Sequence, residues 1–323
     1  MCFADAKLLG GPISVSVGAS VGSSYPDLSK YDFSTGSFWI TLDAKISENI
    51  RAYIRGFLTR RFRENGRFVD SIDKIDFESF FTSAYIEIRD IGGQPIIFVI
   101  GKHSIPFGLD TRKMPSFYSD PTFWTIDTNA GVFGFTIKLE NIPFFDLVEI
   151  SGFESKGRDW SIGTVDGAAL RLTKNLTRRL KASASYLRRN NTDYDYRELE
   201  DRMSIGLIFE SGKWTTWVEG LHVTNNFFLP DMKAGIVAGV TKKIGKGEII
   251  VQGTYLTNTL KQLGIGYKIP INSYLTIGAE TRYTELIYGT GYWSFTARAT
   301  IFFRDIFKSS ADSEKETTEL SFF

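Results

Sequence analysis

Apolar and polar residues alternate with a period of two along most of this chain. Near the start, Ile13, Val15 and Val17 are separated by serines, and near the end Trp293 and Phe295 are separated by Ser294. Such alternation is typical of a β-strand with two different faces, whereas the spacing of an amphipathic helix is hard to find. The pattern predicts sixteen strands, at about residues 13–21, 38–46, 50–55, 80–88, 95–103, 133–139, 144–153, 162–172, 180–186, 205–209, 214–223, 234–240, 249–255, 263–267, 275–283 and 293–303.

The connections between these strands differ in length in a regular way. Those after even-numbered strands are short turns, and those after odd-numbered strands are mostly longer and polar, a difference that fades after the thirteenth strand. With 323 residues there are about 20 residues for each strand and its connection, enough for spanning strands of ~10 residues. We therefore expect an all-β fold, a transmembrane antiparallel barrel of about sixteen strands. A large soluble β-protein is the alternative, because period two does not tell which face is inside.

Aromatic residues support the membrane barrel. They make up 15% of the chain although its mean hydropathy is only −0.11. The longest apolar runs are about six residues, far below the ~18 needed for a spanning helix. Several aromatics stand at strand ends, where interfacial girdles form: Tyr186, Tyr255, Tyr267, Tyr283, Trp293 and Phe303.

The two ends of the chain are expected to lie outside the barrel, which we place at residues 7–303. Ala4-Asp5-Ala6 fits a signal-peptidase site, so residues 1–6 are interpreted as the remnant of a cleaved signal peptide; an ordinary N-terminus is the alternative. Cleavage there would remove Cys2, the one cysteine. The tail, residues 304–323, is expected either to hang in the periplasm or to add a last strand segment ending in Phe323.

Charge and residue types exclude several functions. The chain has 38 basic and 37 acidic residues, a net charge of +1, which argues against binding nucleic acid. With only His103 and His222, a histidine metal site is not expected, and no cofactor motif or phosphate-binding loop is present. We expect no catalytic residues; an outer-membrane lipase or protease, for example one pairing a serine with His222, is the weakest alternative.

The polar strand faces carry charges that would line a water-filled lumen. These are Arg51, Arg55, Arg179, Lys181, Glu219, Glu280, Arg282 and Arg298. Cations that line a pore favour anions, although such charges can also do no more than keep a lumen wet. A separate Arg-rich loop around residues 60–67 could contact lipopolysaccharide phosphates.

One stretch interrupts the rhythm. The apolar run Ile96–Ile100 leads into GKHSIPFGLD, Gly101–Asp110, where Pro106 cannot donate to a sheet. About twenty further residues show no clean period. We expect this insert after the fifth strand to fold into the barrel and narrow it, with opposed charges from Asp110, Arg112, Lys113, Asp120 and Asp127.

This stretch resembles a known group of proteins. Its Gly101, Lys102, Pro106, Phe107 and Gly108 are similar to the G-(K/Q)-x-x-x-P-F-G segment of the phosphate-selective porin O and P group, and SDPT at 119–122 is similar to a segment of the LbtU-type siderophore porins. The likeness covers about twenty residues. It implies a sixteen-stranded outer-membrane barrel with this segment opening a loop into the channel. The chain lacks the dense basic ladder of phosphate-selective pores and the N-terminal coiled coil of many siderophore porins, so the substrate class does not transfer.

Together these features predict an exported outer-membrane porin, through which small polar solutes diffuse passively, with a preference for anions as one option. The alternative is a ligand-specific channel for a siderophore or another metal chelate. Expected partners are the solutes, lipopolysaccharide and outer-membrane lipid, and the barrel assembly machinery that recognises a C-terminal Phe. The porin is expected to be either a monomer or a homotrimer.

Overall fold

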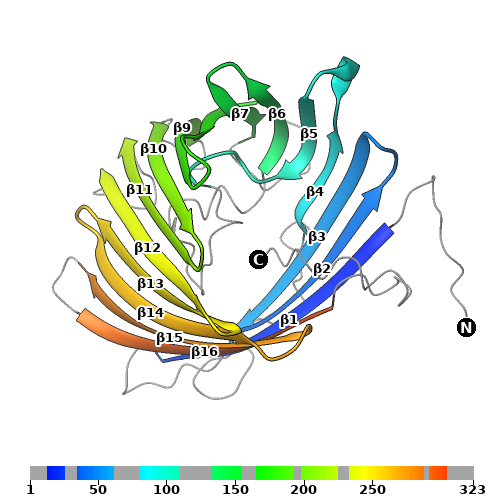
Figure 1. Cartoon of the computed structure of the whole chain (residues 1–323). Helices are drawn as coiled ribbons and strands as arrows, with labels where there is room; N and C mark the ends of the chain where they lie inside the picture. Colours follow the sequence, from blue (N-terminus) through cyan, green and yellow to red (C-terminus); the bar gives the residue numbers. More distant parts are fainter. Residues whose placement is uncertain are drawn as a thin grey trace, which may run out of the picture.

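The chain forms a closed barrel of sixteen antiparallel strands, each hydrogen-bonded to its neighbours in sequence and with β1 paired to β16 (Figure 1). This architecture comes from a computed structural model, which describes residues 13–25, 35–61, 81–109, 132–154, 165–191, 198–224, 233–286 and 291–303. The expectation of a sixteen-stranded barrel is therefore confirmed. The signal-peptide remnant and the C-terminal tail lie outside the described residues.

The strands are mostly 8 to 14 residues long, which is the length that a tilted strand needs to cross a bilayer. In order they are β1 Ile13–Tyr25, β2 Thr35–Lys45, β3 Ile50–Arg61, β4 Phe81–Ile88, β5 Ile96–His103, β6 Val132–Ile142, β7 Phe145–Phe153, β8 Gly167–Asn175, β9 Leu180–Asn191, β10 Glu198–Ser211, β11 Trp214–Thr224, β12 Ala234–Ile244, β13 Gly247–Leu256, β14 Leu260–Pro270, β15 Leu275–Leu286 and β16 Gly291–Phe303. A single 3-10 turn, Ile91–Gly93, joins β4 to β5. Among the described residues there is no helix long and apolar enough to cross a membrane.

The short turns gather at one rim of the barrel, because they follow the even-numbered strands. Their polar side chains hold the backbone: Ser47 Oγ accepts hydrogen bonds from the backbone N–H of Asn49 and Ile50, at 3.3 and 3.1 Å. Gly212 and Gly245 stand in the left-handed region that such tight turns require. The longer connections follow odd-numbered strands, and the brief exceptions are Thr257–Thr259 after β13 and the four residues between β15 and β16. The predicted division of connections into two rims is confirmed.

The eighth strand differs from the prediction. It was expected at residues 162–172, but β8 begins at Gly167 and continues through Asn175. The turn comes later because Thr177 Oγ1 accepts hydrogen bonds from the backbone N–H of Arg179 and Leu180. The alternation of apolar and polar residues predicted that a strand lies here. The hydrogen bonds of Thr177 determine where the strand ends.

Large apolar side chains on one face of the strands are exposed. Their exposure reaches 70% for Ile205, and the set also includes Ile86, Ile100, Ile150, Ile236, Ile265, Ile277, Phe295 and Ile301. An apolar surface of this extent on the outside of a barrel suits contact with lipid rather than water.

Aromatic pairs stand on this outward face near both rims. Tyr283 and Trp293 lie 5.2 Å apart between ring centroids near the long-loop rim, and Tyr274 and Phe303 lie 5.3 Å apart near the short-turn rim. Aromatic rings at these two levels match the girdles that membrane barrels place at the bilayer interfaces.

Candidate functional site

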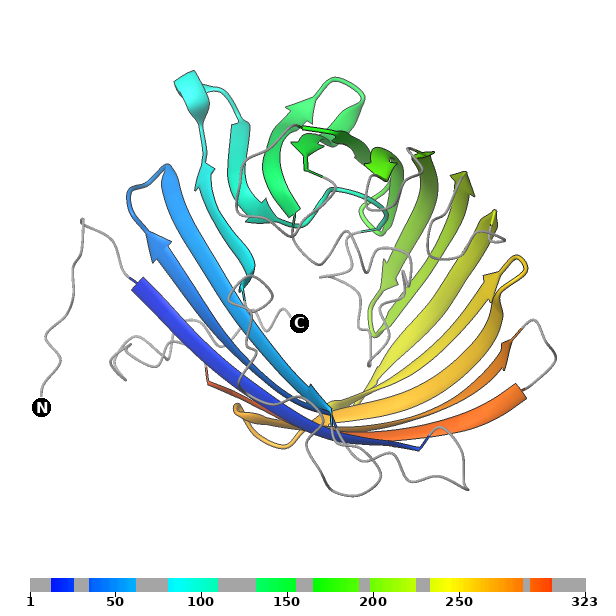
Figure 2. The same ribbon diagram turned by 180° about the vertical axis from the view of Figure 1, so that it is seen from behind.

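The segment after β5, Ser104–Leu109, runs inside the barrel and lies against β8, β9 and β11 (Figure 2). The backbone N–H of Gly108 donates to Ser185 Oγ on β9 at 2.9 Å, and that of Leu109 donates to Glu219 Oε1 on β11 at 3.2 Å. Arg171 Nη1 on β8 reaches the Gly108 carbonyl at 3.5 Å. The segment was expected to fold into the barrel, and Ser104–Leu109, the part that the structure describes, does so.

Apolar side chains fasten the segment to the wall. Ile105 and Phe107 are 7% and 3% exposed and join a cluster of inward-facing residues: Val132, Phe153, Ala169, Leu187, Leu221, Val223, Val237 and Leu256. Leu109, 2% exposed, packs in a second cluster with Ile208, Trp217 and Ile250. Burying each such side chain contributes about 1.5–3 kcal/mol. An inner wall this apolar would be costly in a water-filled lumen unless something covered it.

Two glycines make this close approach possible. A Cβ at Gly206 on β10 would lie 2.4 Å from Leu109 Cγ, so only a glycine leaves room for the leucine. Gly108 has a φ of 71°, a left-handed conformation that other residues rarely adopt. The wall and the segment therefore fit each other residue by residue.

Beneath the segment lies a buried polar network. Glu149 on β7 is 3% exposed and accepts a 2.5 Å hydrogen bond from Arg171 Nε, while Lys138 Nζ lies 3.8 Å from its other oxygen. A buried carboxylate is tolerable only when it is paired in this way. Sequence reasoning missed Glu149 and Arg171, although their alternation with apolar neighbours placed both on the polar face.

Histidine 103, at the end of β5, belongs to the same wall. One ring nitrogen, Nε2, lies 2.6 Å from Thr136 Oγ1, and the other lies 2.9 Å from the Gly101 carbonyl. Thr136 Oγ1 in turn donates to Ser151 Oγ at 3.1 Å. Both nitrogens of His103 therefore have partners inside the fold.

The pairing of strands tells which other residues face inward. Residues directly opposite in an antiparallel ladder share a face. Because Glu219 points inward, the residues that lie opposite it from strand to strand also point inward: Val237, Thr254, Gln262 and Thr284. Continued around the barrel, this register places most of the sequence-predicted lumen charges on the inner face: Arg51, Arg55, Lys181, Glu219, Glu280, Arg282 and Arg298. Arg179 is the correction, because it lies exposed in the turn before β9 rather than on the wall.

Most inward charges described here form ion pairs. Arg51 donates through Nε to Asp43 Oδ1 at 2.6 Å. Arg189 and Arg202 flank Glu200, which is 0% exposed, at 2.8 and 2.5 Å. Further pairs join Arg89 to Glu87, Lys268 to Glu248 and Arg282 to Glu280. Pairing leaves a polar wall with alternating sign rather than a continuous positive ladder.

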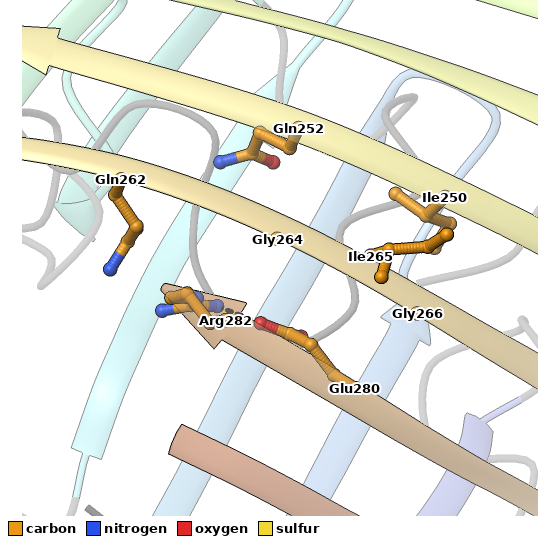
Figure 3. A pocket seen from close by; sticks show the side chains of 8 residues that line it. All are labelled: Ile250, Gln252, Gln262, Gly264, Ile265, Gly266, Glu280 and Arg282. Carbon is orange, nitrogen blue, oxygen red and sulfur yellow. Dashed lines mark hydrogen bonds and ion pairs between the residues drawn. The ribbon is translucent and has the colours of Figure 1, made fainter. Parts of the chain in front are cut away.

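A polar recess opens on the inner wall of β13–β15, and Ile250, which lines it, also belongs to the cluster of Leu109 (Figure 3). Gly264 and Gly266 leave space there, and Gln252 and Gln262 present amides beside the Glu280–Arg282 pair. One carboxylate oxygen, Glu280 Oε2, is buried without a hydrogen-bond partner. The recess offers donors and acceptors on one side of the lumen, as polar solutes require.

The proposed charges of the constriction lie outside the described residues: Asp110, Arg112, Lys113, Asp120 and Asp127. Their place in the lumen stays a prediction. The motif residues that precede them are described. Pro106, Phe107 and Gly108 are buried in the inward segment, whereas Lys102 shares the outward register of Ala84 and Phe133, with Nζ 5.9 Å from the Phe133 ring centroid.

The described residues contain no group of three His, Cys, Asp or Glu side chains that could hold a metal ion.

Comparison with known proteins supports the fold and goes no further. No family model matches the chain, and no curated protein matches it. Solved structures do. The outer-membrane channel DcaP of Acinetobacter baumannii has a TM-score of 0.59 at 13% identity, covering 91% of this chain and 97% of that one. OmpF of Salmonella typhi has a TM-score of 0.64 at 10% identity, covering 91% and 97%.

An anion-selective porin from Comamonas acidovorans is similar to the same degree, with a TM-score of 0.58 at 10% identity, over 91% of this chain and 99% of that one. These likenesses span nearly the whole of each chain. The fold is therefore the barrel fold of outer-membrane porins.

Proposed function

We propose that this protein is an outer-membrane porin through which small polar solutes diffuse passively. The observation that carries the proposal is the inward segment Ser104–Leu109, fastened by buried side chains and hydrogen bonds to the wall of β8–β11. A barrel of this size needs such a segment only if its lumen is open and must be narrowed. The solute path then runs between the segment and the polar wall of β13–β16 and β1–β4.

Passage needs no cofactor and no covalent step. Charges of both signs across the path would create a transverse field that orients a dipolar solute, and the low-dielectric walls strengthen this field relative to bulk water. Asp110, Arg112, Lys113, Asp120 and Asp127 are the charges that we assign to the narrow point. Inward arginines tip the selectivity toward anions, but the many ion pairs keep that preference modest.

The same proposal includes export through a cleaved signal peptide, assembly by the barrel assembly machinery, and a homotrimer in contact with lipopolysaccharide and outer-membrane lipid. Contact with outer-membrane lipid is supported by the exposed apolar face with aromatic pairs near both rims. The motif at Gly101–Gly108 favours relatives of the phosphate-selective O and P group or the LbtU-type siderophore porins.

A ligand-specific uptake channel is the second candidate. The observation in its favour is the recess at Gln252, Gln262, Glu280 and Arg282, whose amides and ion pair offer donors and acceptors to a solute passing along this wall. We assign no enzymatic role. Both nitrogens of His103 are engaged in the wall, and His222 stands on the outward face opposite Met203 and Ala234, without a serine across the ladder.

Conductance of the purified protein in planar bilayers tests the proposal. Stable ohmic steps in potassium chloride are the expected result, and block of these steps by a single siderophore or metal chelate would instead favour specific uptake. A folded barrel that inserts into bilayers without conducting would contradict both. Folding is checked independently by heat-dependent mobility in detergent gels.

A further inference from the structure

We infer that the inner wall of β3 and β4 holds a subsite for small aromatic carboxylates, of which benzoate is the simplest. The inference rests on the proposed function. It begins with Tyr53 and Tyr85, which stand directly opposite each other on the ladder, with ring centroids 5.1 Å apart and planes at 25°. Tyr85 also meets His103 edge-on at 6.3 Å. The two phenol rings stack on each other on the lumen side, where both are half-buried, and we call this stacked pair the tyrosine platform.

Arg55 follows Tyr53 by two residues on the same face of β3. Within the described part of the chain, its guanidinium makes no hydrogen bond or ion pair, and its Nε is buried without a partner. Its neighbours differ: Arg51 is held by Asp43, and Arg89 by Glu87. Arg55 is thus available to an anion, and the planar fork of a guanidinium binds a carboxylate through two parallel hydrogen bonds.

The spacing suits one molecule that uses both features. Two residues along a strand separate Arg55 from the tyrosine platform by ~7 Å, so a carboxylate at Arg55 would place an attached ring against Tyr53 of the stacked pair. At the level of Arg55, Thr41 on β2 and Ser83 on β4 stand opposite it on the same face and add hydroxyl groups.

Local charge favours an anion. The Asp43–Arg51 and Glu87–Arg89 pairs are each neutral, so positive charge is left on this face by Arg55 and, beyond the tyrosine platform, by Lys45 opposite Arg51. Inorganic phosphate would use Arg55 but leave the platform unused. An aromatic monocarboxylate satisfies both the guanidinium and the rings, because offset stacking adds to the charge-assisted hydrogen bonds.

Binding of radiolabelled benzoate to the folded, detergent-solubilised protein tests the inference without requiring conduction. We expect a dissociation constant on the order of 1 mM, as for a small ligand with few contacts. Cyclohexanecarboxylate has the same charge and similar size without a π-face, and should bind about 5-fold more weakly. Tyr53→Leu with Tyr85→Leu should remove this difference, whereas Tyr53→Phe with Tyr85→Phe should keep it.

Two arginine variants complete the experiment. Arg55→Gln should weaken benzoate binding roughly 10-fold, whereas Arg179→Gln, which removes an exposed arginine from the turn before β9, should leave it unchanged. Equal binding of benzoate and cyclohexanecarboxylate, or equal loss in both arginine variants, would overturn the subsite. Absence of conductance with benzoate binding intact would reject the porin alone, so the two failures are distinguishable.

Discussion

Removing the side chains that fasten the inward segment should open the channel. Phe107 and Leu109 are 3% and 2% exposed in two separate apolar clusters, and truncating a buried Phe or Leu to Ala typically costs about 3 kcal/mol or more. We take the free energy of docking the segment onto the wall as about 5 kcal/mol, within the range of local units that open on their own. Phe107→Ala alone then raises the undocked fraction about 100-fold, but the segment stays mostly docked. Phe107→Ala with Leu109→Ala removes about 6 kcal/mol and should release it.

Single-channel conductance and the size limit for sugars in liposome swelling measure this release. We expect rare upward steps in the single variant, and a larger mean conductance with a larger size limit in the double variant. Phe107→Leu is the control, because it keeps most of the buried apolar volume and should behave like the native protein. Gly206→Leu should also release the segment, because the new side chain on the barrel wall would occupy the space of Leu109.

The reasoning is refuted if the double variant keeps native heat-dependent mobility, and so a closed barrel, while conductance and size limit stay unchanged. The segment would then have no part in setting the aperture. If the double variant fails to fold, the Gly206→Leu variant decides the question, because it alters the barrel wall at one position and leaves the segment intact.

Three further predictions concern charge. Arg171→Met should lower the free energy of unfolding by about 3 kcal/mol, because Glu149 loses its main partner. Urea unfolding in detergent measures this change, and Arg171→Met with Glu149→Leu should recover most of the loss. Full stability of the single variant would contradict the account. Arg112→Ala with Lys113→Ala should shift the reversal potential toward cations, and an unchanged potential would place both outside the lumen. Anion preference should fall between 0.1 and 1 M salt, as the screening length drops from about 10 to about 3 Å; a preference independent of salt would point to a binding site instead of a field.

The inward segment itself was visible in the sequence as a strand that stops at Pro106 and an insert without period. The contacts that attach the segment to the barrel wall were not visible in the sequence. Phe107 and Leu109 look like ordinary apolar residues, and the residues that receive them come from β6 to β13, as far along the chain as Leu256. No local pattern records contacts between segments so far apart.

The sequence by itself determined the number of strands, their two faces and the division of connections between two rims, because all three follow from local alternation and turn chemistry. Only the tertiary structure decided which face is inside and which charges meet. Arg51 and Arg55 have the same residue type, strand and face, yet strand register places Asp43 beside the first and only hydroxyl residues opposite the second. Register and closure are properties of all sixteen strands together, and they set the chemistry of the lumen.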